Sequence, residues 1–115
     1  MGAFAIIGDM APANFKHIVI NNGAHDSVGG QPTVGLKIDI PAIAGACGYK
    51  TVLRASSAGE VIEKLKVLQS CPGPALLEVM VNKGARKDLG RPTSHPIENK
   101  QTFQKFIRQS TIDTD

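Results

Sequence analysis

Residues 15–33 read FKHIVINNGAHDSVGGQPT and decide the fold class, because a run of β-branched residues gives way abruptly to a polar, glycine-rich segment. The unbroken run of Ile18, Val19 and Ile20 predicts a strand buried on both faces of a parallel sheet. Ligands of open α/β sheets bind beyond the carboxyl ends of the strands. Residues 21–33 are therefore the first place to look for a binding site, although Asn-Gly and Gly-Gly are also common in plain turns.

Two further strands are predicted at residues 50–54 and 75–81, and a helix precedes each of them. The first of these helices begins at Asp39, a good capping residue, and ends at Gly48. The second begins with the capping box Ser57–Glu60. Its predicted buried stripe consists of Val61, Ile62, Leu65 and Leu68. Strands that alternate with helices predict an α/β fold with a parallel sheet and helices on both faces.

The two ends of the chain are also predicted to be helical. Residues 1–14 predict a short helix, so the unit opens on a helix and resembles a domain that lacks its start. We therefore expect a fragment of a longer chain. Residues 97–109 predict the last helix, after a loop over residues 81–94. The buried face of that helix is expected to consist of Phe103, Phe106 and Ile107.

The composition is that of one globular domain. The chain has 115 residues and a mass of 12.2 kDa, 42% of its residues are hydrophobic, 20% are charged, and its mean hydropathy is −0.05. No apolar run approaches the roughly 20 residues that span a bilayer, and no basic stretch marks a signal peptide. Cys47 and Cys71 lack metal-ligand spacing and predict reduced, buried thiols. We therefore expect a cytoplasmic protein with no membrane partner.

The net charge of +3 does not indicate a nucleic-acid partner. Nucleic-acid-binding proteins concentrate basic residues and interleave aromatic ones, whereas aromatic residues make up only 4% of this chain and tryptophan is absent. Lys83–Lys87 is the only dense basic stretch, and we interpret it as a solvated loop. We expect no nucleic acid as a partner, while a small anionic ligand is compatible with the charge.

Four segments carry a family resemblance: HIVINNGAHDSVGGQPTVG (17–35), IDIPAIAGACGY (38–49), EVMVNKGARKDLGRP (78–92) and HPIENKQTFQKFI (95–107). In this order they resemble the thiamine-diphosphate-dependent phosphonopyruvate decarboxylases, with the sulfopyruvate decarboxylases next in similarity. The resemblance covers nearly the whole chain and is to the C-terminal part of these enzymes. It implies that residues 1–115 are the C-terminal part of a thiamine-diphosphate-binding domain, truncated at its N-terminal side.

The resemblance implies a magnesium site in the segment after the first strand. Such enzymes bind the cofactor diphosphate through Mg²⁺; Asn22 matches the family's asparagine ligand, and Ala24 matches the residue whose carbonyl binds the metal. Mg²⁺ prefers hard oxygen ligands of this kind. The family's aspartate ligand, in a Gly-Asp-Gly motif, has no match. Asp9 lies only 22 − 9 = 13 residues before Asn22, about half the family's spacing, and we expect it on the surface.

The resemblance assigns further residues of this segment to the cofactor or the substrate. The expected cofactor-binding residues are Asn22, Gly23, Ala24, His25, Asp26 and Ser27. The residues expected to contact the substrate or to shape the loop are Gly29, Gly30 and Gln31. Backbone N–H groups of such a glycine-rich loop can hold an anion. For His25 and Asp26, a purely structural function in the loop is the alternative.

A few residues outside this segment have structural or open assignments. We expect His17, inside its strand, to be structural, and we predict no partner for His95. The basic residues expected either to attract an anionic substrate or to lie in a solvated loop are Arg86, Lys87 and Arg91.

The reaction that the resemblance implies is the conversion of a 2-oxo acid with an anionic head group, 3-phosphonopyruvate, to phosphonoacetaldehyde and CO₂. No catalytic residue is expected in this chain, because the family's activating glutamate belongs to a missing N-terminal domain or a partner subunit. We therefore expect the isolated chain to be inactive and the whole enzyme to be a homo-oligomer. The alternatives are a sulfopyruvate decarboxylase subunit and a non-catalytic α/β ligand-binding module.

Overall fold

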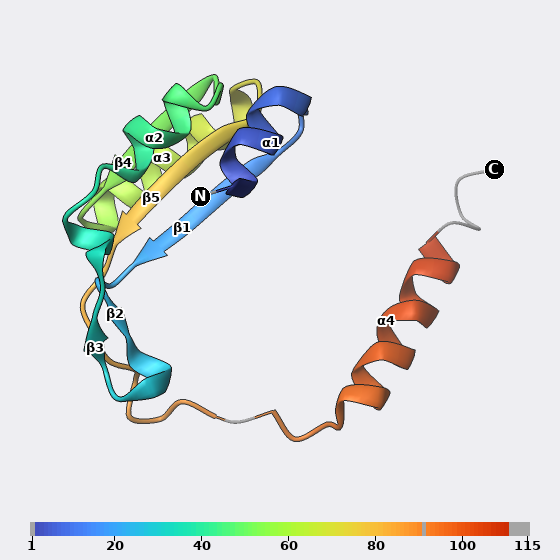
Figure 1. Cartoon of the computed structure of the whole chain (residues 1–115). Helices are drawn as coiled ribbons and strands as arrows, with labels where there is room; N and C mark the ends of the chain where they lie inside the picture. Colours follow the sequence, from blue (N-terminus) through green and yellow to red (C-terminus); the bar gives the residue numbers. More distant parts are fainter. Residues whose placement is uncertain (1, 91, 111–115) are drawn as a thin grey trace. The chain divides into compact units, whose positions relative to one another are not determined.

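The computed structural model describes residues 2–90 and 92–110, and the chain divides into two units, Met1–Gly84 and Ala85–Asp115 (Figure 1). In chain order, the first unit contains α1 (Gly2–Met10), β1 (Lys16–Asn21), β2 (Ala24–His25), the 3₁₀ helix η1 (Asp26–Val28), β3 (Gln31–Pro32), the 3₁₀ helix η2 (Val34–Leu36), α2 (Ile40–Ala46), β4 (Thr51–Ala55), α3 (Ala58–Ser70) and β5 (Ala75–Met80). The second unit contains α4 (Pro96–Ser110).

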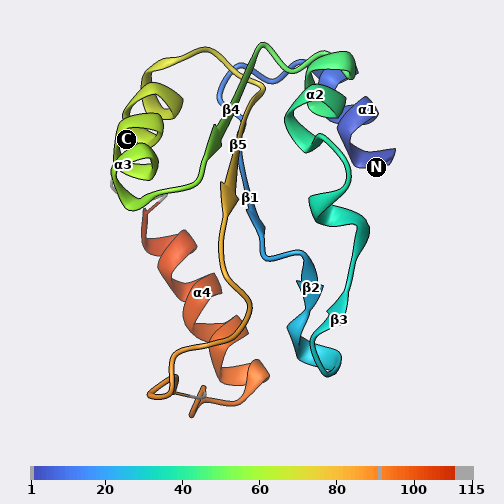
Figure 2. The same ribbon diagram turned by 90° about the vertical axis from the view of Figure 1, so that its left-hand side faces the viewer.

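The first unit is built on a three-stranded parallel sheet with the strand order β1-β5-β4. β5 comes last in the sequence but lies in the middle of the sheet, where Leu77 pairs with Ile18 on one side and with Leu53 on the other. Figure 2 shows α3 on one side of these strands and α1 and α2 on the other. The predicted α/β class, with a parallel sheet and helices on both faces, is therefore confirmed.

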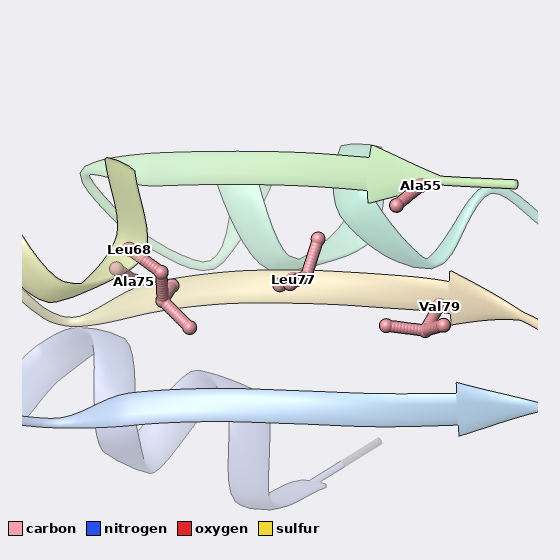
Figure 3. Packing of buried hydrophobic residues seen from close by; sticks show 5 residues of the cluster. All are labelled: Ala55, Leu68, Ala75, Leu77 and Val79. Atoms are coloured by element: carbon pink, nitrogen blue, oxygen red, sulfur yellow. The ribbon is translucent and has the colours of Figure 1, made fainter. Parts of the chain in front are cut away.

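α3 packs on one face of the sheet. The buried cluster on this face, drawn in Figure 3, consists of Ala55, Leu68, Ala75, Leu77 and Val79. Val61 and Leu65 of α3 pack against it. The stripe predicted for α3 is thus confirmed at Val61, Leu65 and Leu68 and wrong at Ile62, which is 59% exposed. Ile62 follows Val61 directly, so its side chain points about 100° further round the helix and away from the sheet.

α1 and α2 pack on the opposite face. The cluster there is centred on Leu76 of β5, Ala44 of α2 and the buried ring of Tyr49. The partly buried residues around it are Phe4, Ile7, Phe15, Val19 and Ile40. Because successive side chains of a strand point to opposite faces, Leu76 and Leu77 belong to different clusters. β5 therefore contributes to both halves of the core.

The prediction that β1 is buried on both faces is wrong. Ile18 and Ile20 are 47% and 63% exposed, and Val19, on the other face, is half-buried. Within the described strands β1 pairs only with β5, and the cluster beneath α3 draws its strand residues from β4 and β5. An apolar run shows that a strand is suited to burial. It does not show whether the strand has a neighbour on each side.

Two helices begin at the residues that the sequence predicts. Asp39 caps α2, since its Oδ1 accepts a hydrogen bond from the Ala42 N–H over 3.1 Å. At the start of α3, Ser57 Oγ accepts a hydrogen bond from the Glu60 N–H over 3.3 Å. Glu60 Oε2 accepts one from the Ser56 N–H over 2.6 Å. These side chains satisfy backbone donors that lack partners within a helix.

The second unit consists of α4 and the segment before it. α4 spans Pro96–Ser110, close to the predicted range. His95, for which no partner was predicted, precedes the helix, and its N–H donates to Glu98 Oε2 over 3.0 Å in an arrangement of the capping-box type. His95 therefore helps to start α4.

The buried face predicted for α4 is wrong within this unit. Phe103, Phe106 and Ile107 are 63%, 65% and 48% exposed. The described residues 85–90 and 92–95 contain no other helix or strand, so this unit has no second layer against which an apolar face could pack.

Two predictions concern membranes and thiols. Along residues 2–90 and 92–110, no helix combines the length and the apolar character needed to cross a membrane. Cys47 and Cys71 are free thiols, as predicted, and both are half-buried rather than fully buried.

Candidate functional site

The polar β1 loop, residues 22–33, is folded onto itself at the carboxyl end of β1. β2 and β3 pair in antiparallel fashion as a short hairpin, and η1 lies between them. The Thr33 N–H donates to the Gly23 carbonyl over 2.8 Å, and the Gly30 N–H donates to the His25 carbonyl over 2.9 Å. This segment is therefore an organised loop with backbone structure of its own, at the edge of the sheet where ligands are expected.

Asn22 is fixed at both ends of its side-chain amide. Its Oδ1 accepts a hydrogen bond from the Ala24 N–H over 3.0 Å, and its Nδ2 donates to Asp26 Oδ2 over 2.8 Å. The amide oxygen has a second lone pair. Because the Thr33 N–H donates to the Gly23 carbonyl, Ala24, opposite Pro32, occupies a non-hydrogen-bonded position of the hairpin, where the carbonyl is not used by the partner strand. Asn22 and Ala24 thus offer two neutral oxygens in one turn, a donor set that suits Mg²⁺.

The segment after β5 is tied to the β1 loop. Asp26 Oδ2 accepts a hydrogen bond from the Gly84 N–H over 3.0 Å, and Lys83 Nζ donates to the Gly30 carbonyl over 2.5 Å. Asp26 therefore holds the loop. Lys83–Lys87 is an exposed loop, as predicted, although the Lys83 side chain also contacts the β1 loop. Sequence reasoning missed this residue and Gly84, because only the pairing of β1 with β5 places the two loops side by side.

The other predicted loop residues lie on the exposed part of the β1 loop. His25 of β2 pairs with Gln31 of β3, and Ser27 lies in η1. Gly29 and Gly30 follow with φ values of 83° and 70°, in the left-handed region that favours glycine. The structure thus collects these residues in one loop. Their contacts with a cofactor or substrate stay a prediction.

The buried polar cluster is formed by the buried side chains of Asn21 and Glu78 and by the partly exposed Arg54, near the carboxyl ends of β1, β4 and β5. Glu78 is 1% exposed, and its two carboxylate oxygens accept hydrogen bonds of 2.7 Å from Asn21 Nδ2 and Arg54 Nε. Arg54 Nη2 also pairs with Asp39 Oδ1 over 2.8 Å. The hydrogen bond to Glu78 raises the pKa of Arg54 above its ordinary value, so the guanidinium stays charged at physiological pH.

Sequence reasoning missed this cluster, although one signal was present. Glu78 stands in the otherwise apolar strand ALLEVMV, and a charged side chain buried in such a strand requires a partner. Which partners it has depends on the register of the sheet, where Glu78 lies opposite Arg54.

A cavity of about 390 Å³ opens beside the buried polar cluster. Its charged lining residues are Lys37, Asp39, Arg54 and Glu78, and its apolar ones are Leu36, Ile38 and Met80. The two positive and two negative charges cancel, so this cavity offers no net attraction to an anion. At the β1 loop, Lys83 contributes one positive charge and Asp26 one negative charge, and no salt bridge joins the two in the described residues.

Comparison with known proteins identifies relatives of the chain, although no protein-family model matches it. It is 37% identical over 107 residues to a phosphonopyruvate decarboxylase of Streptomyces viridochromogenes, a match that covers 93% of this chain. It is 36% identical over 109 residues, or 95% of the chain, to a phosphonopyruvate decarboxylase of Streptomyces hygroscopicus. The predicted resemblance to phosphonopyruvate decarboxylases is confirmed. A sulfopyruvate decarboxylase of Methanosarcina acetivorans is 30% identical over 102 residues, or 88% of the chain.

The chain spans only about a quarter of the length of these relatives. The matches cover 27% of each phosphonopyruvate decarboxylase and 26% of the sulfopyruvate decarboxylase. Phosphonopyruvate decarboxylases are therefore similar to nearly all of this chain, while most of their own length lies outside the match. This agrees with the expectation that the chain is part of a longer enzyme. Its assignment to the C-terminal part of a cofactor-binding domain stays a prediction.

His17 is a structural residue, as predicted. Its Nδ1 forms a hydrogen bond of 3.1 Å with the Tyr49 hydroxyl, and its ring lies 5.5 Å from that of Phe4 and 5.8 Å from that of Phe15. Burial raises the pKa of Tyr49 above its ordinary value, and the neighbouring Cys47 adds to the shift. His17 therefore belongs to the core on the α1 and α2 face.

The remaining predicted residues lie outside the β1 loop. Asp9 is exposed near the end of α1, as predicted. Arg86 pairs with Asp88 over 3.5 Å in the second unit, and Lys87 is exposed there. Arg91 lies outside the described residues. In residues 2–90 and 92–110, no group of three or more His, Cys, Asp or Glu side chains is arranged to hold a metal ion.

Proposed function

We propose that this chain is the part of a thiamine-diphosphate-dependent decarboxylase that binds the cofactor's diphosphate through Mg²⁺. The observation that carries the proposal is the single turn that brings the Asn22 amide oxygen within 3.0 Å of the Ala24 N–H, next to the Ala24 carbonyl. The similarity to two phosphonopyruvate decarboxylases over 93% and 95% of the chain supports it. The proposed reaction is the conversion of 3-phosphonopyruvate to phosphonoacetaldehyde and CO₂.

The residues of the β1 loop bind and orient in this proposal. Asn22 and Ala24 would supply two neutral oxygen ligands to Mg²⁺, and Asp26 fixes the amide of Asn22 through its Nδ2. Lys83 uses one of its three N–H donors on Gly30 and keeps two for an anionic oxygen nearby. When bound, thiamine diphosphate supplies the electron sink for the decarboxylation.

The other parts of the active site are proposed to come from the rest of the enzyme. The chain spans 27% of the phosphonopyruvate decarboxylases it matches. The upstream part of the same domain, outside the match, would contribute the carboxylate ligand of the metal. An N-terminal domain or a partner subunit would contribute the activating glutamate. Without these other parts of the enzyme the site is open to water, where electrostatic stabilisation of a developing charge is weak. The isolated chain is therefore expected to release no CO₂ from 3-phosphonopyruvate.

A chimera tests this function. The chain replaces the matching 27% of the Streptomyces viridochromogenes enzyme, and CO₂ release from 3-phosphonopyruvate is measured with Mg²⁺ and thiamine diphosphate. We expect turnover by the chimera, its loss in Asn22→Ala, and its retention in Asp9→Ala, since Asp9 is exposed on α1. The isolated chain serves as the inactive reference.

Folding is checked separately from activity by circular dichroism and gel filtration of each chimera. A folded chimera that binds thiamine diphosphate but is unaffected by Asn22→Ala would overturn the assignment of the metal ligands. A folded chimera that binds no thiamine diphosphate would favour a non-catalytic α/β ligand-binding module. Turnover by the isolated chain above the cofactor-only background would show that it contains a complete site.

Sulfopyruvate is the second candidate substrate. The observation in its favour is the 30% identity to a sulfopyruvate decarboxylase over 88% of the chain. Both substrates are 2-oxo acids with an anionic head group, and Lys83 suits either one. Comparing kcat/KM of the chimera for the two acids decides between them, and we expect 3-phosphonopyruvate to be preferred.

A further inference from the structure

Glu78 is the only buried side chain with a formal charge in residues 2–90 and 92–110, and nothing in the proposed chemistry uses it. Burying a carboxylate costs free energy even when it is paired. Replacing a whole buried ion pair with apolar side chains of similar volume is often neutral or even stabilising, although removing one partner alone is costly. Stability alone therefore does not account for Glu78, and its contacts point to a geometric function.

The carboxylate of Glu78 dictates the orientation of Asn21. An ionised carboxylate only accepts hydrogen bonds, and one of its oxygens is already held by Arg54 Nε. Asn21 must therefore turn its NH₂ group toward the other oxygen, Glu78 Oε1, which lies 2.7 Å from Nδ2. The amide oxygen of Asn21 is thereby directed to the backbone of the β1 loop.

Asn21 in turn fixes the backbone on both sides of the β1 loop. Its Oδ1 accepts a hydrogen bond from the Gly23 N–H over 3.0 Å, and its Nδ2 donates to the Gly35 carbonyl over 2.8 Å. A Cβ at Gly35 would lie 2.9 Å from Asn21 Oδ1, so this close approach requires glycine. Gly23 lies between Asn22 and Ala24, so the Asn21 amide determines where their oxygens lie.

We propose that Glu78 is a positioning residue for the metal ligands of the β1 loop: clamped by Arg54, it orients the Asn21 amide, which holds Gly23 in place. The inference rests on the proposed function only in that Asn22 and Ala24 bind the metal. The effect of Glu78 on the loop rests on hydrogen bonds within this chain. A purely structural function would affect the whole sheet, whereas positioning affects Gly23 first.

Glu78→Gln tests the proposal in this chain without metal or cofactor. The carboxamide keeps the size of the side chain but replaces one acceptor with a donor, so it cannot accept from both Arg54 and Asn21. We expect the Asn21 amide to turn and the Gly23 N–H to lose its acceptor. Hydrogen exchange at Gly23, followed by NMR, should then accelerate at least about ten-fold relative to the exchange of Ala75.

Ala75 is the internal reference because its N–H donates to the Phe15 carbonyl at the other end of the strands. The matched control is Asp39→Asn, which removes the negative charge of the exposed partner of Arg54 and keeps a capping residue for α2. We expect the ratio of the Gly23 and Ala75 exchange rates to be unchanged in the control. If Glu78→Gln does not fold, Arg54→Lys replaces it, and a smaller rise of the same ratio is expected.

Two outcomes would overturn the proposal: equal acceleration at Gly23 and Ala75, which would indicate a loss of stability alone, or no acceleration at Gly23.

A second measurement connects the result to the metal. Mn²⁺, as a paramagnetic substitute for Mg²⁺, is added to the chain, and broadening of the Ala24 amide signal is expected to require more metal in Glu78→Gln than in Asp39→Asn. If Mn²⁺ broadens no amide signal of the β1 loop, the result counts against the proposed function. The hydrogen-exchange result would still test whether Glu78 positions Gly23.

Discussion

Asn21 belongs to the buried polar cluster, and the next residue, Asn22, begins the β1 loop. The two asparagine side chains have different functions. Asn21 is 6% exposed and donates into the sheet, to Glu78. Asn22 is only half-buried, and its amide interacts within the loop, with Ala24 and Asp26. The first asparagine holds the site, and the second keeps a lone pair for a ligand. Burial and partners, rather than residue type, therefore separate the two regions.

The largest expected effect is on the buried polar cluster. In Glu78→Leu, the groups of Arg54 and Asn21 lose their acceptor, and we expect the free energy of unfolding to fall by about 2–3 kcal/mol. The loss is smaller than for a fully buried pair, because Arg54 is 43% exposed and can be hydrated. Urea denaturation followed by circular dichroism measures it. Asp39→Asn should cost less than about 1 kcal/mol, and equal costs would contradict the distinction between the buried and the exposed partner.

The two asparagines test the comparison directly. Asn21→Ala leaves buried groups without partners and should lower the free energy of unfolding of the chain by about 1–3 kcal/mol. Asn22→Ala, at a half-buried position, should change it by less than about 0.5 kcal/mol. In the chimera, Asn22→Ala should weaken binding of Mg²⁺ and thiamine diphosphate at least about ten-fold, since it removes a metal ligand.

Calorimetric titration of the chimera with the cofactor provides the affinities. Asp9→Ala is the control and should bind as the unchanged chimera does. Equal affinities of the Asn22→Ala and Asp9→Ala chimeras would show that Asn22 is not a metal ligand.

The β1 loop could be predicted from the sequence, whereas the buried polar cluster could not. Asn-Gly and Gly-Gly are local signals, and their place after an apolar strand suffices to locate the loop. Glu78 meets Arg54 and Asn21 across sequence separations of 24 and 57 residues. Such meetings depend on the order and register of the strands, which no local pattern encodes. Only the need of a buried charge for a partner was visible beforehand.

A smaller effect is expected where the β1 loop is held by its own side chains. Asp26→Ala removes the acceptor of the Asn22 amide and of the Gly84 N–H. Because Asp26 is exposed, water can replace it, and the free energy of unfolding should change by less than about 0.5 kcal/mol. The chimera should bind the cofactor a few-fold more weakly, since the Asn22 amide becomes free to turn.

Ser27→Ala, at an exposed position in the same loop, is the matched control. It should weaken cofactor binding by the chimera less than Asp26→Ala does. A loss in Asp26→Ala as large as that in Asn22→Ala would instead identify Asp26 as a direct ligand.

The elements themselves were predicted better than their surroundings. The strands and helices around Ile18 and Phe103 lie close to the predicted ranges, yet both side chains are substantially exposed. Periodicity and β-branched composition reflect the local backbone preference and the side chain's affinity for an apolar neighbour. Whether that neighbour is present depends on the rest of the fold. The errors at β1 and α4 have this cause in common.

The smallest expected effect concerns a second buried polar contact, between Tyr49 and His17. The pKa of Tyr49 is raised in the folded chain, so its contribution to stability is fully present below the ordinary tyrosine pKa of about 10. It is lost as the pH rises through the folded-state pKa. Tyr49→Phe should cost about 0.5–1 kcal/mol at neutral pH, through the lost hydrogen bond.

Above about pH 10, the free energy of unfolding should fall more steeply in the unchanged chain than in Tyr49→Phe. Urea denaturation at a series of pH values measures both slopes. Parallel slopes would show that the Tyr49 hydroxyl ionises as easily in the folded chain as in the unfolded one.

The position of β5 between β1 and β4 has a consequence for how the chain folds during synthesis. Ala75 pairs with Lys16 and with Thr51, which precede it by 75 − 16 = 59 and 75 − 51 = 24 residues. β1 and β4 therefore leave the ribosome before the strand that both of them need, and neither can pair until β5 has been made. The sheet cannot grow strand by strand, and such non-local pairing is slow to form. Until β5 arrives, the nascent chain carries apolar strand segments with open edges, the kind of surface that aggregates or recruits a chaperone.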